Sequence, residues 1–205
     1  MNFQIRVLGS SSALPTSNRF PTAQVVLYNN EPFLIDCAEG TQIQMRKYNV
    51  PFGKLKNIFI SHLHGDHIYG LFGLLSSFNL LGRKHVLNIY APNKLKEIYE
   101  TVLSLNNDEL KYKIRFYPLD HSSKNLIYEN KYIRVFSFPL KHSKQSFGFL
   151  FEEKQKQKNI KKEVIDEYNL SIKQILEIKD GKNLIINNKT IQNSYLTTNA
   201  APTLS

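Results

Sequence analysis

Cysteine is nearly absent from the chain, which has a single one, Cys37, among 205 residues. One thiol excludes an internal disulfide, and this usage suits a reducing compartment. Because Cys37 directly follows the apolar segment FLID, we expect a small buried thiol rather than a reactive site.

Long apolar runs are absent as well. No segment approaches the ~20 residues that a helix needs to cross a bilayer. The N-terminal residues MNFQIRVLGSSSALP lack a basic region followed by an apolar stretch and a cleavage site. We therefore expect a cytoplasmic protein with no membrane contact. The 41% of hydrophobic residues suffice for one globular domain with a sizeable core.

Acidic residues are in the minority. The chain has 17 Asp and Glu against 27 Lys and Arg, for a formal net charge of +10. This balance favours a polyanionic partner, of which nucleic acid is the first candidate. The alternative is a basic surface that only keeps the protein soluble.

Strands and helices are expected to mix in the order of an α/β protein. Alternating or compact apolar residues predict strands at 3–7, 23–28, 32–36, 55–60, 113–119, 125–138 and 146–153. The segment 125–138 is expected to be a hairpin that turns near 129–130. Helical spacing predicts helices at 41–48, 69–82 and 91–105.

A lysine-rich stretch then changes the character of the sequence from about residue 154 to 190. Five lysines crowd its beginning: Lys154, Lys156, Lys158, Lys161 and Lys162. A short amphipathic helix and polar chain with KDGK and NNKT turns are expected to follow. The pattern indicates a projecting element, and a solvated surface connection is the alternative.

Histidine is scarce, yet three of the six fall within six positions of the segment SHLHGDHIYG, residues 61–70. This segment comes directly after the expected strand 55–60. His62 and His64 are two positions apart in extended chain, so their side chains point to the same side, as two ligands of one cation require.

The next residues of the cluster extend this pattern to a second cation. Gly65 lets the chain curl, so that Asp66 and His67, entering a helix, face a cation beside the first. Two zinc ions ~3.5–4 Å apart form a hydrolytic site that activates water near neutral pH. His142, at the end of a later expected strand, is a further candidate ligand.

Other metal or catalytic patterns are weaker. The zinc-protease motif HExxH is absent. His85 and His121 lack a comparable setting, and we interpret each as a surface or capping histidine.

Four segments in this order resemble ribonuclease Z, a family of the metallo-β-lactamase superfamily. They are LGSSSALPTSNRFPTAQ, LIDCAEGTQIQM, FISHLHGDHIYGLFGLLSS and FPLKHSKQSFGFLFEE. The resemblance covers about residues 3 to 195. It implies an α/β fold of the αββα four-layer sandwich type. The implied activity is zinc-dependent removal of the 3′ trailer from precursor tRNA, by a protein that forms homodimers.

The same resemblance implies roles for particular residues. His62, His64 and His142 would hold the first of two Zn²⁺ ions per complete subunit. Asp66 and His67 would help to hold the second, with Asp66 also the catalytic proton acceptor. The stretch 154–190 would be an arm that clamps tRNA. Substrate contacts would come from Arg19, Lys154, Lys156, Lys158, Lys161 and Lys162.

The sequence departs from the family pattern in three places. Ala38 stands where the family usually has glycine, and the arm lacks the Gly-Pro pair of bacterial relatives. The family also continues beyond LTTNAAPTLS to a bridging aspartate and a further histidine ligand. We therefore expect a single partial domain, 1–205, that lacks the C-terminal third of the family fold. This chain alone is expected to hold about one zinc and to be inactive.

Two alternatives to the endonuclease remain open. One is another phosphodiesterase of the same fold. The other is a catalytically dead remnant that only binds RNA.

Overall fold

The computed structural model describes residues 3–106, 110–142, 144–200 and 202–204. The chain divides into two compact units. The first consists of Met1–Tyr128 and Val135–Leu150, and the second of Glu129–Arg134 and Phe151–Ser205. The expected arm falls inside the second unit, and its role as an arm stays a prediction.

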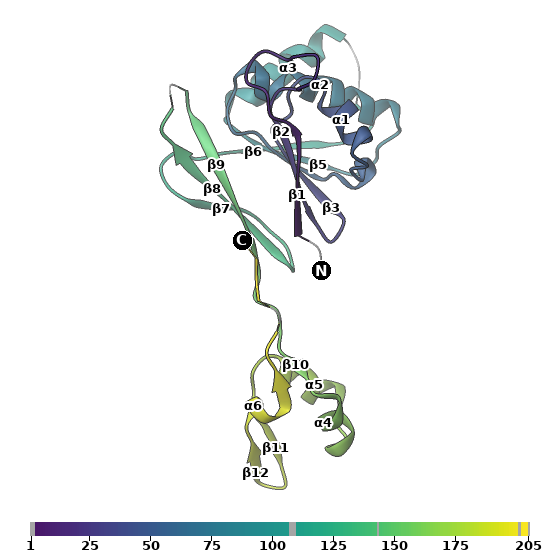
Figure 1. Cartoon of the computed structure of the whole chain (residues 1–205), viewed down its shortest axis with the longest axis vertical. Coiled ribbons are helices and arrows are strands. Elements are labelled where there is room, and N and C mark those ends of the chain that lie inside the picture. Colours follow the sequence, from purple (N-terminus) through teal and green to yellow (C-terminus); the bar gives the residue numbers. More distant parts are fainter. Residues whose placement is uncertain (1–2, 107–109, 143, 201, 205) are drawn as a thin grey trace. The chain divides into compact units, whose positions relative to one another are not determined.

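A six-stranded sheet is the centre of the first unit (Figure 1). Its strands, in spatial order, are β1 Phe3–Gly9, β2 Ala23–Tyr28, β3 Glu31–Ile35, β4 Asn57–Phe59, β5 Leu87–Ala91 and β6 Ile114–Pro118. The first three pair antiparallel, and β3 to β6 pair parallel. The two-residue turn Asn29–Asn30 between β2 and β3 has φ values of 48° and 64°, as a tight hairpin turn requires.

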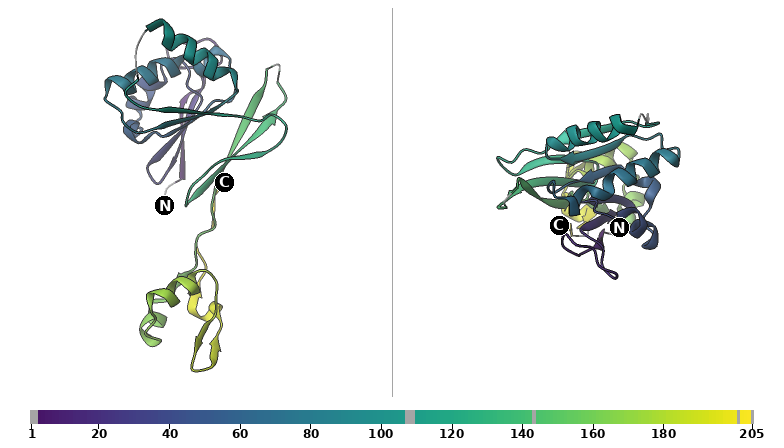
Figure 2. Two further views of the ribbon diagram at one scale, coloured as in Figure 1. Left: turned by 180° about the vertical axis from the view of Figure 1, so that it is seen from behind. Right: turned by 90° about the horizontal axis from the view of Figure 1, so that it is seen from above.

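Three helices connect the parallel strands and cover one face of this sheet (Figures 1 and 2). They are α1 Thr41–Lys47, α2 Gly65–Leu80 and α3 Lys94–Asn106, with the short 3-10 helix η1 Phe52–Lys54 before β4. Buried leucines of α2, such as Leu71 and Leu74, pack in one core with Ile58 of β4 and Ile89 of β5. Gly70 permits the close approach of α2 to the loop after β3, because a Cβ there would lie 1.8 Å from the Ala38 carbonyl oxygen.

A three-stranded sheet packs on the other face of the six-stranded sheet. It consists of β7 Asn125–Glu129, β8 Ile133–Leu140 and β9 Ser146–Glu153, which confirms the hairpin expected near 129–130. Aromatic rings join the two sheets: Phe59 lies 5.5 Å from Phe149 and Phe33 lies 5.6 Å from Tyr128, between ring centroids. Helices, sheet and sheet thus form three successive layers.

The second unit has its own elements: β10 Asn159–Ile160, α4 Lys162–Glu167, α5 Ile172–Lys179, β11 Leu184–Ile186, β12 Lys189–Ile191, α6 Asn193–Leu196 and β13 Thr197–Thr198. The expectation of one helix followed by polar chain was wrong. Two helices and the hairpin β11–β12 form here, because sparse apolar side chains such as Val164, Ile178 and Leu184 pack into a separate small core. The NNKT turn is the hairpin loop, with Asn187 and Asn188 at φ 50° and 60°.

Candidate metal centre

The histidine-rich segment connects β4 to α2. His64 is the N-cap residue of α2, in extended conformation with φ −74° and ψ 149°, and its carbonyl oxygen accepts a bond from the His67 amide at 3.0 Å. Helix α2 therefore begins at Gly65, four residues before the expected 69. The apolar pattern alone marks only the part of the helix that faces the core. The first turn instead carries Asp66, a side chain suited to a helix N-terminus.

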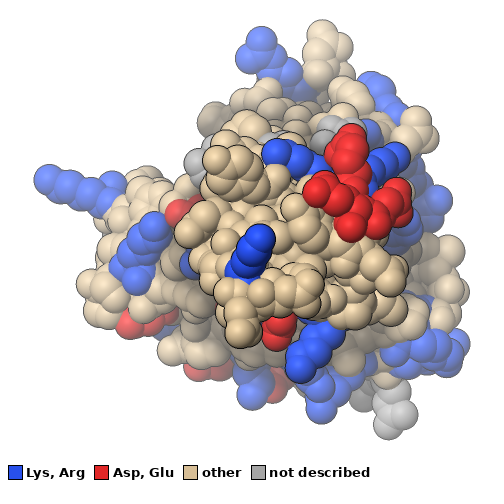
Figure 3. Space-filling view, turned by 90° about the horizontal axis from the view of Figure 1, so that it is seen from below, with Lys and Arg blue, Asp and Glu red and all other residues tan. Residues whose placement is uncertain are grey.

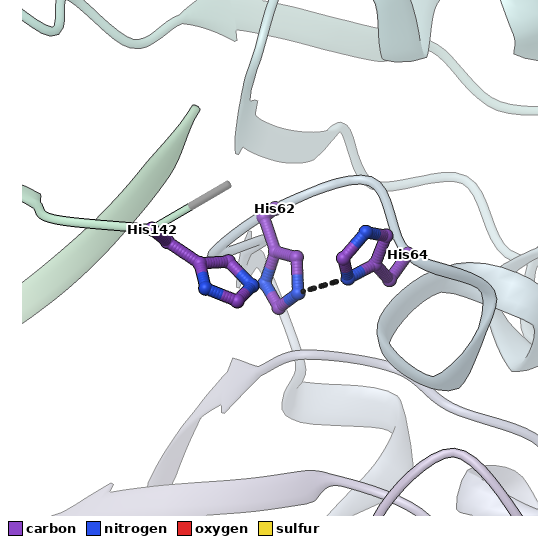
Figure 4. A group of neighbouring side chains, drawn as sticks. All are labelled: His62, His64 and His142. Atoms are coloured by element: carbon purple, nitrogen blue, oxygen red, sulfur yellow. Dashed lines mark hydrogen bonds between the residues drawn. The ribbon is translucent and has the colours of Figure 1, made fainter. Parts of the chain in front are cut away.

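Three histidines meet where this segment comes close to the end of β8 (Figure 4). One ring nitrogen from each of His62, His64 and His142 lies within 4.8 Å of the others. His62 Nε2 is 3.0 Å from His64 Nδ1. His62 is buried, His64 is half-buried and His142 is exposed. The structure thus brings together residues that are about 80 positions apart in the sequence.

The two remaining residues of the motif form a pair beside this cluster. His67 Nε2 lies 3.6 Å from Asp66 Oδ2, and the His67 ring centroid is 3.9 Å from that of His62. All five expected metal ligands therefore belong to one neighbourhood in the first unit. That they bind metal stays a proposal.

Asp36 joins this neighbourhood, although the sequence analysis did not select it. It follows β3, the parallel neighbour of β4, and is 3% exposed, with a left-handed φ of 58°. Its carboxylate accepts bonds from the Ser61 amide at 2.7 Å and the Ser61 hydroxyl at 2.8 Å, and lies 2.7 Å from His67 Nδ1. An acidic residue directly after a strand beside β4 was the available signal, since the carboxyl ends of parallel strands share one edge.

Burial and charge set opposite pKa shifts on two of the histidines. Burial, reinforced by the neighbouring histidines, lowers the pKa of His62 to about 4. Its ring is therefore neutral near pH 7 and keeps a lone pair for a cation. Burial also acts to lower the pKa of His67, but the hydrogen bond to Asp36 and the charge of that carboxylate outweigh it, and the pKa of His67 is raised.

The donor set fits a borderline metal ion such as zinc. Three imidazole nitrogens within 4.8 Å of one another match the ligand type and number that catalytic zinc sites take from the protein. The carboxylate behind His67 is the kind of partner that orients a metal-binding histidine.

Arg19 and the two other histidines lie outside this cluster. Arg19 is exposed in the loop between β1 and β2, where its amide donates to the Thr16 hydroxyl at 3.0 Å. His85 is exposed before β5, as expected of a surface histidine. His121 is also exposed, with its ring centroid 5.4 Å from that of Phe147.

Three of the five expected substrate-binding lysines already have partners in the second unit. The Nζ atom of Lys154 lies 2.5 Å from Glu129, and that of Lys156 lies 3.0 Å from Glu153. Lys158 donates to Asn193 Oδ1 at 2.9 Å. In the face drawn in Figure 3, Lys and Arg side chains are spread over the surface, and Asp and Glu form one large patch and several smaller ones.

Other lysines of this unit are unengaged. Within the described part of the chain, no side-chain hydrogen bond or ion pair involves Lys161, Lys162, Lys173 or Lys189. All except Lys161 are exposed. The sequence pattern gave equal weight to every lysine at the start of the arm, because it contains no information on their acidic and amide partners.

Comparison with known proteins places the chain in a family. The family model described as anti-Pycsar protein Apyc1 matches residues 3–176. The chain belongs to that family. Among curated proteins, the ribonuclease Z of Bacteroides thetaiotaomicron is 41% identical over 201 residues, which are 98% of this chain and 64% of that protein. The ribonuclease Z of Azobacteroides pseudotrichonymphae is 45% identical over 152 residues, 74% of this chain and 53% of that protein.

Solved structures show the fold of the chain. The short form of human tRNase Z superposes with a TM-score of 0.68 and 31% identity, covering 73% of this chain and 64% of that one. YhfI of Bacillus subtilis, a metallo-β-lactamase-fold protein, has a TM-score of 0.59 at 18% identity, with coverage of 74% and 58%. The metallo-β-lactamase fold and the resemblance to ribonuclease Z are therefore confirmed. The chain spans a little less than two thirds of the length of the B. thetaiotaomicron relative.

Among the described residues, none of the helices combines the length and apolar character required to span a bilayer.

Proposed function

We propose that this chain is the metal-binding part of a hydrolase that cuts precursor tRNA at its 3′ trailer. The observation that carries the proposal is the cluster of His62, His64 and His142 beside Asp66 and His67. It occurs in a chain that is 41% identical to a protein named ribonuclease Z and superposes on a human tRNase Z.

Each residue of the cluster has a proposed role. His62, His64 and His142 hold one Zn²⁺, and His67 with Asp66 contributes to a second. When bound, zinc supplies Lewis-acid chemistry that polarises a phosphoryl oxygen and lowers the pKa of water. Asp66 orients the attacking water and accepts its proton. Its half-buried position next to His67 Nε2 supports this role.

The second unit supplies the proposed RNA contacts. Double-stranded RNA is recognised mainly through its shape and phosphates, which favours accessible lysines without acidic partners. Lys162, Lys173 and Lys189 meet this description better than Lys154, Lys156 and Lys158. Arg19 remains a proposed contact in the first unit. The cytoplasmic location and the homodimer stay predictions.

A second candidate is a different phosphodiesterase of the same fold. The observation that favours it is the family model, whose description names an anti-Pycsar protein rather than a ribonuclease. A third candidate, an RNA-binding protein without catalysis, would need the metal cluster to be vestigial.

A cleavage assay separates these candidates. The 205-residue chain, and the chain joined to the part of the B. thetaiotaomicron relative that lies outside the match, are incubated with precursor tRNA and Zn²⁺ or Mn²⁺. We expect the joined protein to release the trailer, the chain alone not to do so, and His64→Ala to abolish release. His85→Ala, an exposed histidine outside the cluster, is the matched control and should remain active.

The other outcomes identify the alternatives. If the joined protein hydrolyses bis(p-nitrophenyl) phosphate but leaves precursor tRNA uncut, the result would contradict the tRNA endonuclease and favour the second candidate. A gel shift with tRNA but no cleavage of either substrate by the joined protein would favour the third.

A further inference from the structure

We propose that Ser61 is a positioning residue for the histidine metal site, a role that rests on the proposed metal-binding function. Ser61 lies between β4 and His62 and is half-buried. Its hydroxyl donates to Asp36 Oδ2 at 2.8 Å and lies 3.0 Å from His62 Nδ1. Its amide donates to the other oxygen of the same carboxylate at 2.7 Å.

The two nitrogens of His62 face different partners. Nε2 points to His64 within the ligand cluster, whereas Nδ1 points to the Ser61 hydroxyl. A histidine that binds a metal through one nitrogen carries a proton on the other, and the hydrogen bond of that proton fixes the tautomer and ring orientation. With a cation on Nε2, the proton of His62 is on Nδ1, and Ser61 Oγ is its acceptor.

A hydroxyl is suited to this place because it accepts one hydrogen bond and donates another. His62 Nδ1–H donates to Ser61 Oγ, and Ser61 Oγ–H donates to Asp36 Oδ2. The buried carboxylate therefore acts on His62 through Ser61, although it does not contact that ring directly.

The same carboxylate oxygen also contacts His67, one of the second pair of ligands. His67 Nδ1 lies 2.7 Å from Asp36 Oδ2, which leaves His67 Nε2 facing Asp66. Asp36 itself is fixed by burial and by its amide, which donates to the Phe59 carbonyl oxygen at 2.8 Å. One fixed carboxylate thus orients a ligand from each site, directly in His67 and through Ser61 in His62.

Removal of the hydroxyl should weaken metal binding without unfolding the protein. In Ser61→Ala, the Ser61 amide and His67 still satisfy Asp36, but His62 Nδ1 loses its acceptor. Loss of such a partner typically costs 10- to 100-fold in metal affinity. We therefore expect zinc affinity to fall roughly 10- to 100-fold and the cobalt absorption spectrum to change.

The test uses Ser61→Ala together with the pair Ser61→Thr and Ser61→Val, which have nearly the same shape and differ in the hydroxyl. Ser104→Ala, on the exposed side of α3, is the control for loss of a serine hydroxyl elsewhere. Zinc affinity is measured by competition with a chromophoric chelator, the site geometry by Co²⁺ absorption, and folding by circular dichroism of the metal-free protein.

The proposal predicts that Ser61→Thr and Ser104→Ala bind zinc like the original chain, while Ser61→Ala and Ser61→Val bind it more weakly. It is overturned if the folded Val and Thr variants bind zinc equally well and give the same cobalt spectrum. The Thr and Val pair decides the matter even if Ser61→Ala does not fold. Failure of the unchanged chain to bind any zinc or cobalt would overturn the proposed function itself.

Discussion

The histidine cluster of the first unit and the lysines of the second unit differ in what holds their side chains. In the cluster, the buried Asp36 and the hydroxyl of Ser61 orient His62 and His67, and the ring nitrogens of the ligand set converge on one point. In the second unit, Lys154, Lys156 and Lys158 instead bond to acidic or amide groups of that unit.

This difference shows that a concentration of one residue type has two physical meanings. Imidazole nitrogens that lie within 4.8 Å of one another can bind one cation together. Lysines that form ion pairs or hydrogen bonds with groups of their own unit contribute to the stability of that unit. The first pattern supports a metal site, whereas the second separates lysines of structural use from those available to RNA.

The largest expected effect concerns Asp66. In the protein completed with the remainder of its relative, Asp66→Asn should lower the rate of tRNA cleavage about 10²- to 10⁴-fold, the usual contribution of a positioned base. The affinity for tRNA should change little, because phosphates are held elsewhere. Single-turnover cleavage and a gel shift measure the two quantities. If the cleavage rate and the tRNA affinity fell by the same factor, Asp66 would act in tRNA binding rather than in proton transfer.

The next effect is on stability and concerns Asn193, which is 6% exposed. Its amide nitrogen donates to the carbonyl oxygens of Ile178 and Lys182 at 2.7 and 2.8 Å, and its oxygen accepts from Lys158. Asn193→Ala leaves these groups unpaired, so we expect the second unit to lose about 3 kcal/mol of unfolding free energy. Denaturant titration and hydrogen exchange of this unit measure the loss, with Asn199→Ala, an exposed asparagine of the same unit, as a control.

A smaller effect should separate available lysines from engaged ones. Lys173→Ala with Lys189→Ala should flatten the salt dependence of tRNA binding by roughly 1–2 units of log–log slope, since each lost phosphate contact removes about one. The double variant Lys154→Ala with Lys158→Ala should instead lower the free energy of unfolding and leave the salt slope of tRNA binding nearly unchanged. Binding isotherms at several salt concentrations give the answer. A steeper loss for the engaged pair would reverse the assignment of the two groups.

The smallest effect is expected at Cys37. This side chain is fully buried, as expected from the sequence, and burial raises the pKa of its thiol far above the ordinary value. The native protein should therefore not react with Ellman's reagent. The protein unfolded in guanidinium chloride should release one equivalent of thionitrobenzoate. Rapid reaction of the native protein would show that the loop after β3, which also holds Asp36, opens readily.

The histidine cluster could be predicted from the sequence more completely than the second unit, because its donors are close together in the chain. The H-x-H-x-D-H spacing places four donors by local geometry, so the cluster follows from a few consecutive residues, whereas the apolar pattern placed the start of α2 four residues too late. The end of a strand was enough to select His142. The strands of the first unit were also recognisable, because each carries its own apolar pattern.

Tertiary contacts determine what the sequence analysis missed. Asp36 reaches His67 only because β3 lies beside β4, and Ser61 gains a role only from the carboxylate that this pairing brings to it. The core of the second unit collects isolated residues such as Val164 and Leu184, whose segments look polar one at a time. The partners of Lys154 and Lys158 are likewise remote in sequence.

Metal content tests the central claim most directly. The chain is purified without chelator, and its zinc is counted by elemental analysis and native mass spectrometry. We expect about one tightly held zinc per chain, since among the described residues the histidine triad alone offers the three protein ligands that such a site needs. His64→Ala should lose this zinc and His85→Ala should keep it. A folded protein that contains no zinc, and takes up none when zinc is added, would contradict the account.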